Sequence, residues 1–414
     1  MNTPRSKKLP PRTHLPDELT AEVLSWLPVK SLMRLSSVCK SWNKLITSDQ
    51  TFIKSHLDRS ALRNPQLLLE CEDSNHHPHR GFCVTQVSGL AGADPWISLA
   101  HNPRHRLREY FDSYDVVGSC NGLICLEVFP YRASVGHGWV HIWNPATGLM
   151  SERLVSFCYG RRYFRYKMNF CYDNSTNTYK VVYFRIDKTD RASHVQIFTL
   201  GGGSNGWRDI QNFPLLPFSY DDSGVNDGAH LSGTINWMAS RRDESAPHYN
   251  PETITVEQLV ILSLDLGTET YTLLLPPKGL DQVPCVLPRV WVFMDCLCFS
   301  HDSNKTHFVI WQMNKFGDAE SWVQILKISY QDIPMRRLSP FTHHKECFLH
   351  PLSYAYRLFY NGDTLVLAVG RQAILYNRSS NTFEQPTTTN REFCRYKFSW
   401  YLALDYVESL VSLY

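Results

Sequence analysis

Apolar residues are spaced in two different ways along this chain, and the change falls at Asn64-Pro65. Between residues 15 and 57 they recur every three to four positions, which is the period of an amphipathic helix. Beyond residue 65, short aromatic or β-branched runs separated by Pro- and Gly-rich loops continue with a period of two. The sequence therefore predicts a disordered basic tail over residues 1–14, a small all-α module over 15–60 and a large all-β domain over 65–414.

The predicted helical module carries start and stop signals. Pro16 suits the first position of a helix, and Pro28 ends that helix. Ser31 is predicted to cap the second helix and Asp49 the fourth. Four helices within about forty residues bury too little surface to be stable alone, so they must pack on a neighbouring domain or a partner. Two interpretations of the helices are therefore open. They are either a cap on the following domain or a module with an apolar patch that binds a partner.

A family resemblance bears on this choice. The stretches 15–19, 23–24, 27–32 and 38–40, with Arg34, Trp42 and 45–46, together resemble an F-box over its whole length. The resemblance implies docking on a Skp-type adaptor, which bridges to a cullin. The adaptor contacts that it implies are Leu15, Pro16, Leu19, Val23, Leu24, Leu27, Pro28, Val29, Leu32 and Val38.

The all-β part contains a loose repeat. Each unit has an apolar strand that begins at a turn, then a second strand that ends in Asn or Asp, a Thr/Ser/Gly turn and an aromatic residue. Such units start near residues 121, 233, 296 and 363, with a variant pair at 179–184 and 195–200. Aromatic residues make up 13% of the chain, which favours strands.

Stacking these units radially would protect their edges, as in a β-propeller of about six blades. The sixth unit would combine residues 66–69 or 82–84 with residues 401–404 and thereby close the ring. The alternative architecture is a β-sandwich.

The same segments resemble the plant F-box-associated domain, which is related to kelch-like propellers. The resemblance rests on blocks 118–123, 143–148, 172–173, 179–182 and 230–237. The block Asn144-Pro145-Ala146-Thr147-Gly148 predicts a turn between strands in which Gly supplies a positive φ. These blocks look structural and identify no substrate.

Charge and composition exclude several classes of protein. The net charge is +3, and the first sixty residues carry ten Lys and Arg against five Asp and Glu, so the β part is near neutral. A neutral domain lacks the positive surface that nucleic-acid backbones require. The basic N-terminal residues are not followed by an apolar stretch, and no run approaches a membrane span. Scattered cysteines within apolar runs predict buried free thiols in a reduced compartment, cytoplasmic and/or nuclear.

No pattern of catalytic or metal-binding residues emerges. His76-His77-Pro78-His79 lies in a polar loop and lacks the paired ligands at set spacing that a zinc site needs. No nucleophile elbow or phosphate loop is present, so no cofactor and no metal are expected.

One segment, residues 159–167, is crowded with aromatic and basic side chains. It is either an ordinary strand edge with solvated charges or part of a recognition surface, because Arg and Tyr are enriched at interface hot spots. Strand alternation would place Arg161, Tyr163 and Arg165 on the outer face, where they are candidates for binding a target protein.

The two resemblances together imply a non-catalytic substrate-recognition subunit of a Skp–cullin–F-box ubiquitin ligase. The F-box would hold the adaptor while the propeller captures an unidentified target protein. Two alternatives stay open: a propeller enzyme of glycosidase or oxidase type with a helical cap, and an F-box scaffold that works outside a ligase.

Overall fold

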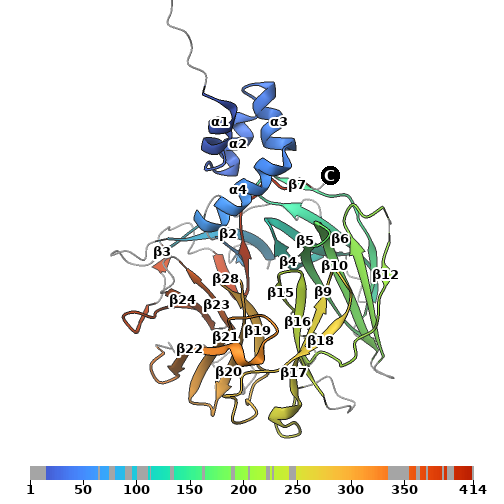
Figure 1. Cartoon of the computed structure of the whole chain (residues 1–414), viewed down its shortest axis with the longest axis vertical. Helices are drawn as coiled ribbons and strands as arrows, with labels where there is room; N and C mark the ends of the chain where they lie inside the picture. The colour runs from blue at the N-terminus through green and yellow to red at the C-terminus, as the bar shows by residue number, and fades with distance from the viewer. Residues whose placement is uncertain are drawn as a thin grey trace, which may run out of the picture.

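The computed structural model of the chain combines four short helices with a large all-β part (Figure 1). It describes residues 15–63, 66–73, 80–88, 96–99, 111, 113–130, 135–160, 164–187, 192–203, 206–220, 224–225, 228–241, 249–333, 354–359, 364–369, 372–384, 387–388 and 396–412. The predicted N-terminal tail, residues 1–14, lies outside this part of the chain.

The helices are α1 (Asp17–Leu24), α2 (Val29–Leu35), α3 (Lys40–Ser48) and α4 (Gln50–Arg63). Pro16 and Pro28 directly precede α1 and α2, because a proline has no amide hydrogen to donate and its fixed φ suits the entry to a helix. The predicted cap at Asp49 is confirmed, since its Oδ1 accepts a hydrogen bond of 2.9 Å from the amide of Phe52. The predicted cap at Ser31 is wrong: α2 already begins at Val29, so Ser31 lies inside the helix.

The β part consists, among the described residues, of six sheets with four or five strands and one two-stranded sheet. Most of them are antiparallel meanders in which strands consecutive in sequence are hydrogen-bonded neighbours. The first meander contains β4 (Ser113–Cys120), β5 (Leu123–Phe129), β6 (Val135–Asn144) and β7 (Leu149–Met150), with β8 (Ser156–Gly160) also pairing with β6.

The next three meanders follow the same plan. The second contains β9 (Phe164–Asp173), β10 (Thr178–Asp187), β11 (Ser193–Thr199) and β12 (Arg208–Asp209). The third contains β15 (Ala229–Leu231), β16 (Thr234–Ser240), β17 (Leu259–Asp265) and β18 (Tyr271–Leu274). The fourth contains β19 (Arg289–Phe293), β20 (Cys296–Ser303), β21 (His307–Met313) and β22 (Trp322–Ser329).

The fifth meander contains β23 (Tyr354–Phe359), β24 (Thr364–Val369), β25 (Gln372–Asn377) and β26 (Thr382–Glu384). The small sheet pairs β13 (Ser219–Tyr220) with β14 (Gly224–Val225).

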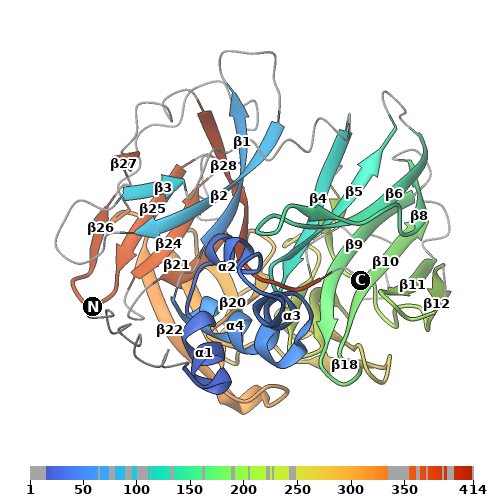
Figure 2. The ribbon, with the colours of Figure 1, turned by 90° about the horizontal axis from the view of Figure 1, so that it is seen from above.

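The remaining sheet joins the two ends of the β part. It has the order β27 (Thr387–Thr388), β3 (Trp96–Leu99), β2 (Arg80–Ser88), β1 (Gln66–Asp73) and β28 (Tyr396–Tyr406). Strands β1 and β28 are antiparallel, with Leu68 opposite Leu404 and Leu67 opposite Asp405. The predicted closure of the ring by residues 66–69 and 401–404 is thereby confirmed. Seen from above, the sheets follow one another around a ring (Figure 2), which is a propeller rather than a sandwich.

Apolar side chains between neighbouring sheets hold the ring together. Between β9–β12 and β15–β18, Phe184 and Trp237 are both fully buried and meet edge to face, with ring centroids 5.8 Å apart. Such aromatic pairs bury much apolar area and add about 0.5–1.5 kcal/mol through their geometry. The predicted burial of free thiols holds for Cys125, Cys171 and Cys298, whereas Cys120, Cys158 and Cys296 are only partly buried.

A side-chain cap recurs in the hairpin turns of several sheets. Asn144 Oδ1 accepts from the amides of Ala146 and Thr147, and Asp265 Oδ1 accepts likewise from Gly267 and Thr268. Gly148 has a φ of 75°, as the predicted turn requires. These Asx turns satisfy backbone amides that the strands leave unpaired, which confirms a structural role for that block.

Strand directions separate two edges of the ring. Strand β6 ends at Asn144, beside Ala146, which packs against the helical core. Because β8 is antiparallel to β6, with Gly160 opposite Val135, β8 ends at the edge away from the helices. The connection from β8 to β9 therefore starts on the side of the propeller opposite the helical module.

Candidate functional site

The helical module exposes an unusual amount of apolar side chain. Among the described residues, six of the large hydrophobic side chains that remain exposed belong to it: Leu15, Leu19, Val23, Trp26, Met33 and Val38, with exposed fractions of 38–63%. Several exposed large apolar side chains in one small module are typical of an interaction site. We call these six residues the apolar face of the helical module.

The ten predicted adaptor contacts divide by burial. Leu15, Pro16, Leu19, Val23, Pro28 and Val38 are exposed, and Leu27 is half-buried. By contrast, Leu24, Val29 and Leu32 are at most 4% exposed and form the core of the module with Ile46, Phe52 and Ile53. These three cannot meet a partner while the helices stay packed, so their place is beneath the apolar face rather than on it.

Two members of the apolar face were absent from the predicted contacts. Trp26 lies in the turn after α1, and Met33 lies on α2 beside Arg34. Met33 lies three residues after Lys30 and next to Arg34, so it is an apolar residue among charged ones. The spacing of apolar residues in so short a helix does not show whether such a side chain faces the core or the surface.

Helix α4 fixes the position of Trp26. The Arg59 guanidinium lies 5.0 Å from the centre of the Trp26 ring and binds Glu22 with an Nη2–Oε2 distance of 2.6 Å. Glu22 in turn accepts a hydrogen bond of 3.3 Å from the Trp26 indole. The hydrogen bond from Arg59 lowers the pKa of Glu22. This triangle holds an aromatic side chain at the edge of the apolar face, where it is available to a partner.

The predicted target-binding segment is only partly described. Arg161 and Tyr163 lie outside the described residues, and Arg165 is a half-buried residue of β9 opposite Ile186 that is engaged with another group. Tyr166 packs inward against Phe157 and Tyr183, with centroids 5.8 and 6.1 Å apart. The predicted alternation along the strand thus holds for Tyr166, and target binding by the three named residues stays a prediction.

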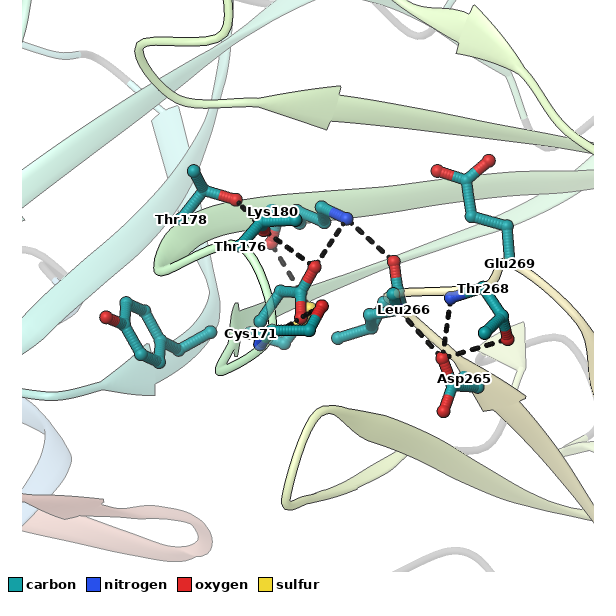
Figure 3. A network of polar contacts seen from close by, with 12 residues as sticks. Cys171, Thr176, Thr178, Lys180, Asp265, Leu266, Thr268 and Glu269 are labelled. Carbon is teal, nitrogen blue, oxygen red and sulfur yellow. Dashed lines mark hydrogen bonds and ion pairs between the residues drawn. The ribbon is translucent and has the colours of Figure 1, made fainter.

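A buried ion pair within the β9–β12 sheet is hydrogen-bonded to the neighbouring sheet (Figure 3). Lys180 Nζ lies 2.8 Å from Asp173 Oδ2 and donates a hydrogen bond of 2.7 Å to the carbonyl of Leu266 in the next sheet. Asp173 also accepts hydrogen bonds from Ser175 and Thr176. Burial alone would raise the pKa of Asp173, but these hydrogen bonds outweigh it and hold the pKa well below its usual value. With every polar atom engaged, the pair acts as a cross-link between sheets.

A cavity with a volume of about 290 Å³ lies between residues 279–285 and 301–305. At its wall, the ring of His301 is bonded on both sides: Nε2 accepts from the Trp311 indole at 3.3 Å, and Nδ1 lies 3.0 Å from the Asp302 carbonyl. Burial lowers the pKa of His301. A histidine held in this way supports the wall and is not poised for proton transfer.

No cluster of three or more His, Cys, Asp or Glu suited to a metal occurs in the described ranges, and the loop His76–His79 lies outside them. Among the described helices, none has both the length and the apolar character to cross a membrane.

Comparison with protein families decides the assignment. The sequence pattern of the F-box domain matches residues 13–54, and that of the F-box associated beta propeller domain matches residues 80–413. The chain belongs to the F-box-associated β-propeller family. Both resemblances noted in the sequence are thereby confirmed, and the apolar face lies within the F-box match.

Curated relatives share this organisation. An F-box/kelch-repeat protein of Arabidopsis thaliana is 26% identical over 408 residues, which cover 92% of this chain and 93% of that protein. Another F-box protein of the same plant is 26% identical over 327 residues, covering 75% of this chain and 68% of the relative.

Solved structures with distant likeness include the Dos1 propeller, at 11% identity and a TM-score of 0.34, covering 75% of this chain and 67% of that one. An exo-β-1,3-galactanase from Phanerochaete chrysosporium has the same identity and TM-score, covering 76% and 70%.

Proposed function

We propose that this chain is the substrate-recognition subunit of a Skp–cullin–F-box ubiquitin ligase in the cytoplasm and/or nucleus. The observation that carries the proposal is the apolar face of the F-box. Its leucine, valine and tryptophan side chains are 46–63% exposed in the described part of the chain. A Skp-type adaptor would cover this face and connect the chain to a cullin.

The contribution of the chain would be proximity rather than bond making. A ligase accelerates ubiquitin transfer when the target is held close to the charged enzyme, because binding converts a bimolecular encounter into an intramolecular one. In this arrangement the F-box holds the adaptor on one side of the propeller, and the target would be received at the opposite edge, where β8 ends.

Adaptor docking is tested by replacing Leu15 and Pro16 together with Ala. Each buried leucine typically contributes about 1.5–3 kcal/mol to an apolar contact, so the double variant is expected to lose co-purification with a Skp-type adaptor. The matched control replaces Leu273 and Leu275, which are 41% and 45% exposed on and just after β18, and it should bind normally. Unchanged adaptor binding by the Leu15/Pro16 variant would refute the proposal.

Target capture is tested by charge reversal at Arg161 and Arg165. Since Arg and Tyr dominate interface cores, we expect proximity labelling with the double Glu variant to lose partners that the wild type labels, while adaptor binding persists. Reversal at Lys278 and Lys315, whose side chains are 72% and 80% exposed, makes the same change in net charge elsewhere. Identical labelled partners for wild type and the arginine variant would move the recognition surface to other loops.

A further inference from the structure

The segment that follows β28 leaves the propeller and enters the core of the F-box. We call residues 407–412 the clasp. Leu410 is 5% exposed and belongs to the same buried cluster as Leu24, Val29 and Leu32 of the helices. A residue near the C-terminal end of the sequence thus completes the core of the N-terminal module.

The clasp touches the propeller as well as the helices. Val411 packs against the F-box cluster and also against the cluster between the β4–β8 and β9–β12 sheets, which includes Leu123 and Cys125. One side chain therefore contacts both domains. Movement of the helices relative to the ring would break one of these two contacts.

A fully buried asparagine fixes the path of the clasp. The Nδ2 group of Asn144 donates hydrogen bonds of 3.0 Å to the carbonyls of Ser409 and Val411. Its Oδ1 accepts from the amides of Ala146 and Thr147, so the side chain uses both of its donors and its acceptor. Asn144 and Ser409 are both 0% exposed. A buried amide with all its bonds made specifies one arrangement, since any shift leaves polar atoms unpaired.

A glycine turn allows the clasp to approach closely. At Gly122, where φ is +79°, a β-carbon would lie 2.4 Å from the carbonyl oxygen of Val407 and 2.5 Å from Ser409 Oγ. A side chain there would push the clasp away from the β4–β5 turn. The propeller is therefore shaped to hold this segment at a fixed position.

We infer that the clasp is a positioning element that makes the F-box competent to dock: the helices adopt their adaptor-binding form only when β28 has closed the ring and delivered Leu410 to them. The physical reason is the small size of the module, because four short helices bury too little surface on their own. When only a fraction of molecules is competent, apparent affinity falls by that fraction. The docking part of this inference rests on the proposed function.

The test is Leu410→Ala in the full chain. We expect hydrogen exchange of the amides in α1–α4 to rise by at least about tenfold while β15–β22 keep their protection, since a core Leu→Ala change opens a cavity. Adaptor affinity should fall about tenfold or more. Leu410→Met, which conserves volume, should restore both readouts, and Leu273→Ala, at an exposed position of β18, should change neither.

A second variant addresses the clasp without touching the helices. Asn144→Asp keeps the oxygen that caps the turn but sets a carboxylate against the carbonyls of Ser409 and Val411. It should reproduce the faster exchange in α1–α4. Gly122→Ala is a further test of the clasp, and Gly317→Ala is its control. Gly317 has a similar φ of +84°, but no atom lies within 4 Å of its β-carbon position.

The outcomes separate the two proposals. Hydrogen exchange needs no adaptor, so a wild-type chain that fails to bind the adaptor refutes the proposed function and leaves the clasp testable. Unchanged exchange in the helices of both Leu410→Ala and Asn144→Asp would overturn the clasp inference. Faster exchange with unchanged adaptor affinity would overturn its docking part.

Discussion

Replacing Lys180 with Met is expected to lower the free energy of unfolding by about 3–5 kcal/mol, because it leaves the buried Asp173 carboxylate without its counter-charge. Both side chains are at most 6% exposed, so water cannot take over from the ammonium group. The change also removes the hydrogen bond to Leu266, which joins the β9–β12 and β15–β18 sheets. Denaturation of the purified chain in urea, monitored by tryptophan fluorescence, measures the effect.

The matched control is Arg208→Met. Arg208 and Glu269 form an ion pair between the same two sheets, but the arginine side chain is 55% exposed. Exposed pairs typically contribute about 0–1 kcal/mol, so this variant should unfold almost like the wild type. Equal losses for Lys180→Met and Arg208→Met would mean that burial does not set the strength of the inner pair.

The same pair predicts a pH dependence with a definite sign. The folded protein holds the pKa of Asp173 below the ordinary value of 3.8. Its contribution to stability is therefore fully present above that pH and is lost as the pH falls toward the folded-state pKa. Wild type should lose stability steeply below pH 4, and a variant with both Asp173→Asn and Lys180→Met should lose less over the same range.

Deleting residues 401–414 is the second change with a large expected effect. It removes the part of β28 that pairs with Gln66, Leu67 and Leu68, and it removes the clasp. Strand β1 would then present unpaired amides and carbonyls, which template aggregation. We expect the truncated chain to be recovered in aggregates, as judged by size-exclusion chromatography with light scattering. A soluble monomer that melts at the temperature of the full chain would contradict closure by β28.

Much of the fold could be predicted from local patterns. The change of period at residue 65 separates helices from strands, and the Asn144 turn block shows where one hairpin reverses. Closure of the ring followed from an apolar run at each end of the β part, since an unpaired edge strand is a liability.

Other features could not be predicted, because they depend on contacts between distant segments. A helical stripe shows which side is apolar, but it cannot show how much of that side other helices cover. Leu24 and Val29 therefore looked like contacts although they are buried, whereas Val38 is exposed. The bond between Lys180 and Leu266, and the place of Leu410 in the F-box core, join residues that no local pattern connects.

The central claim is that the apolar face of the F-box binds a Skp-type adaptor. The most direct measurement is a calorimetric titration of purified adaptor into the purified full chain at several temperatures. The account predicts one adaptor per chain and a negative heat-capacity change, the signature of apolar burial, with both lost in the Leu15→Ala/Pro16→Ala variant. Absence of binding by the wild type, or equal binding by the variant, would contradict it.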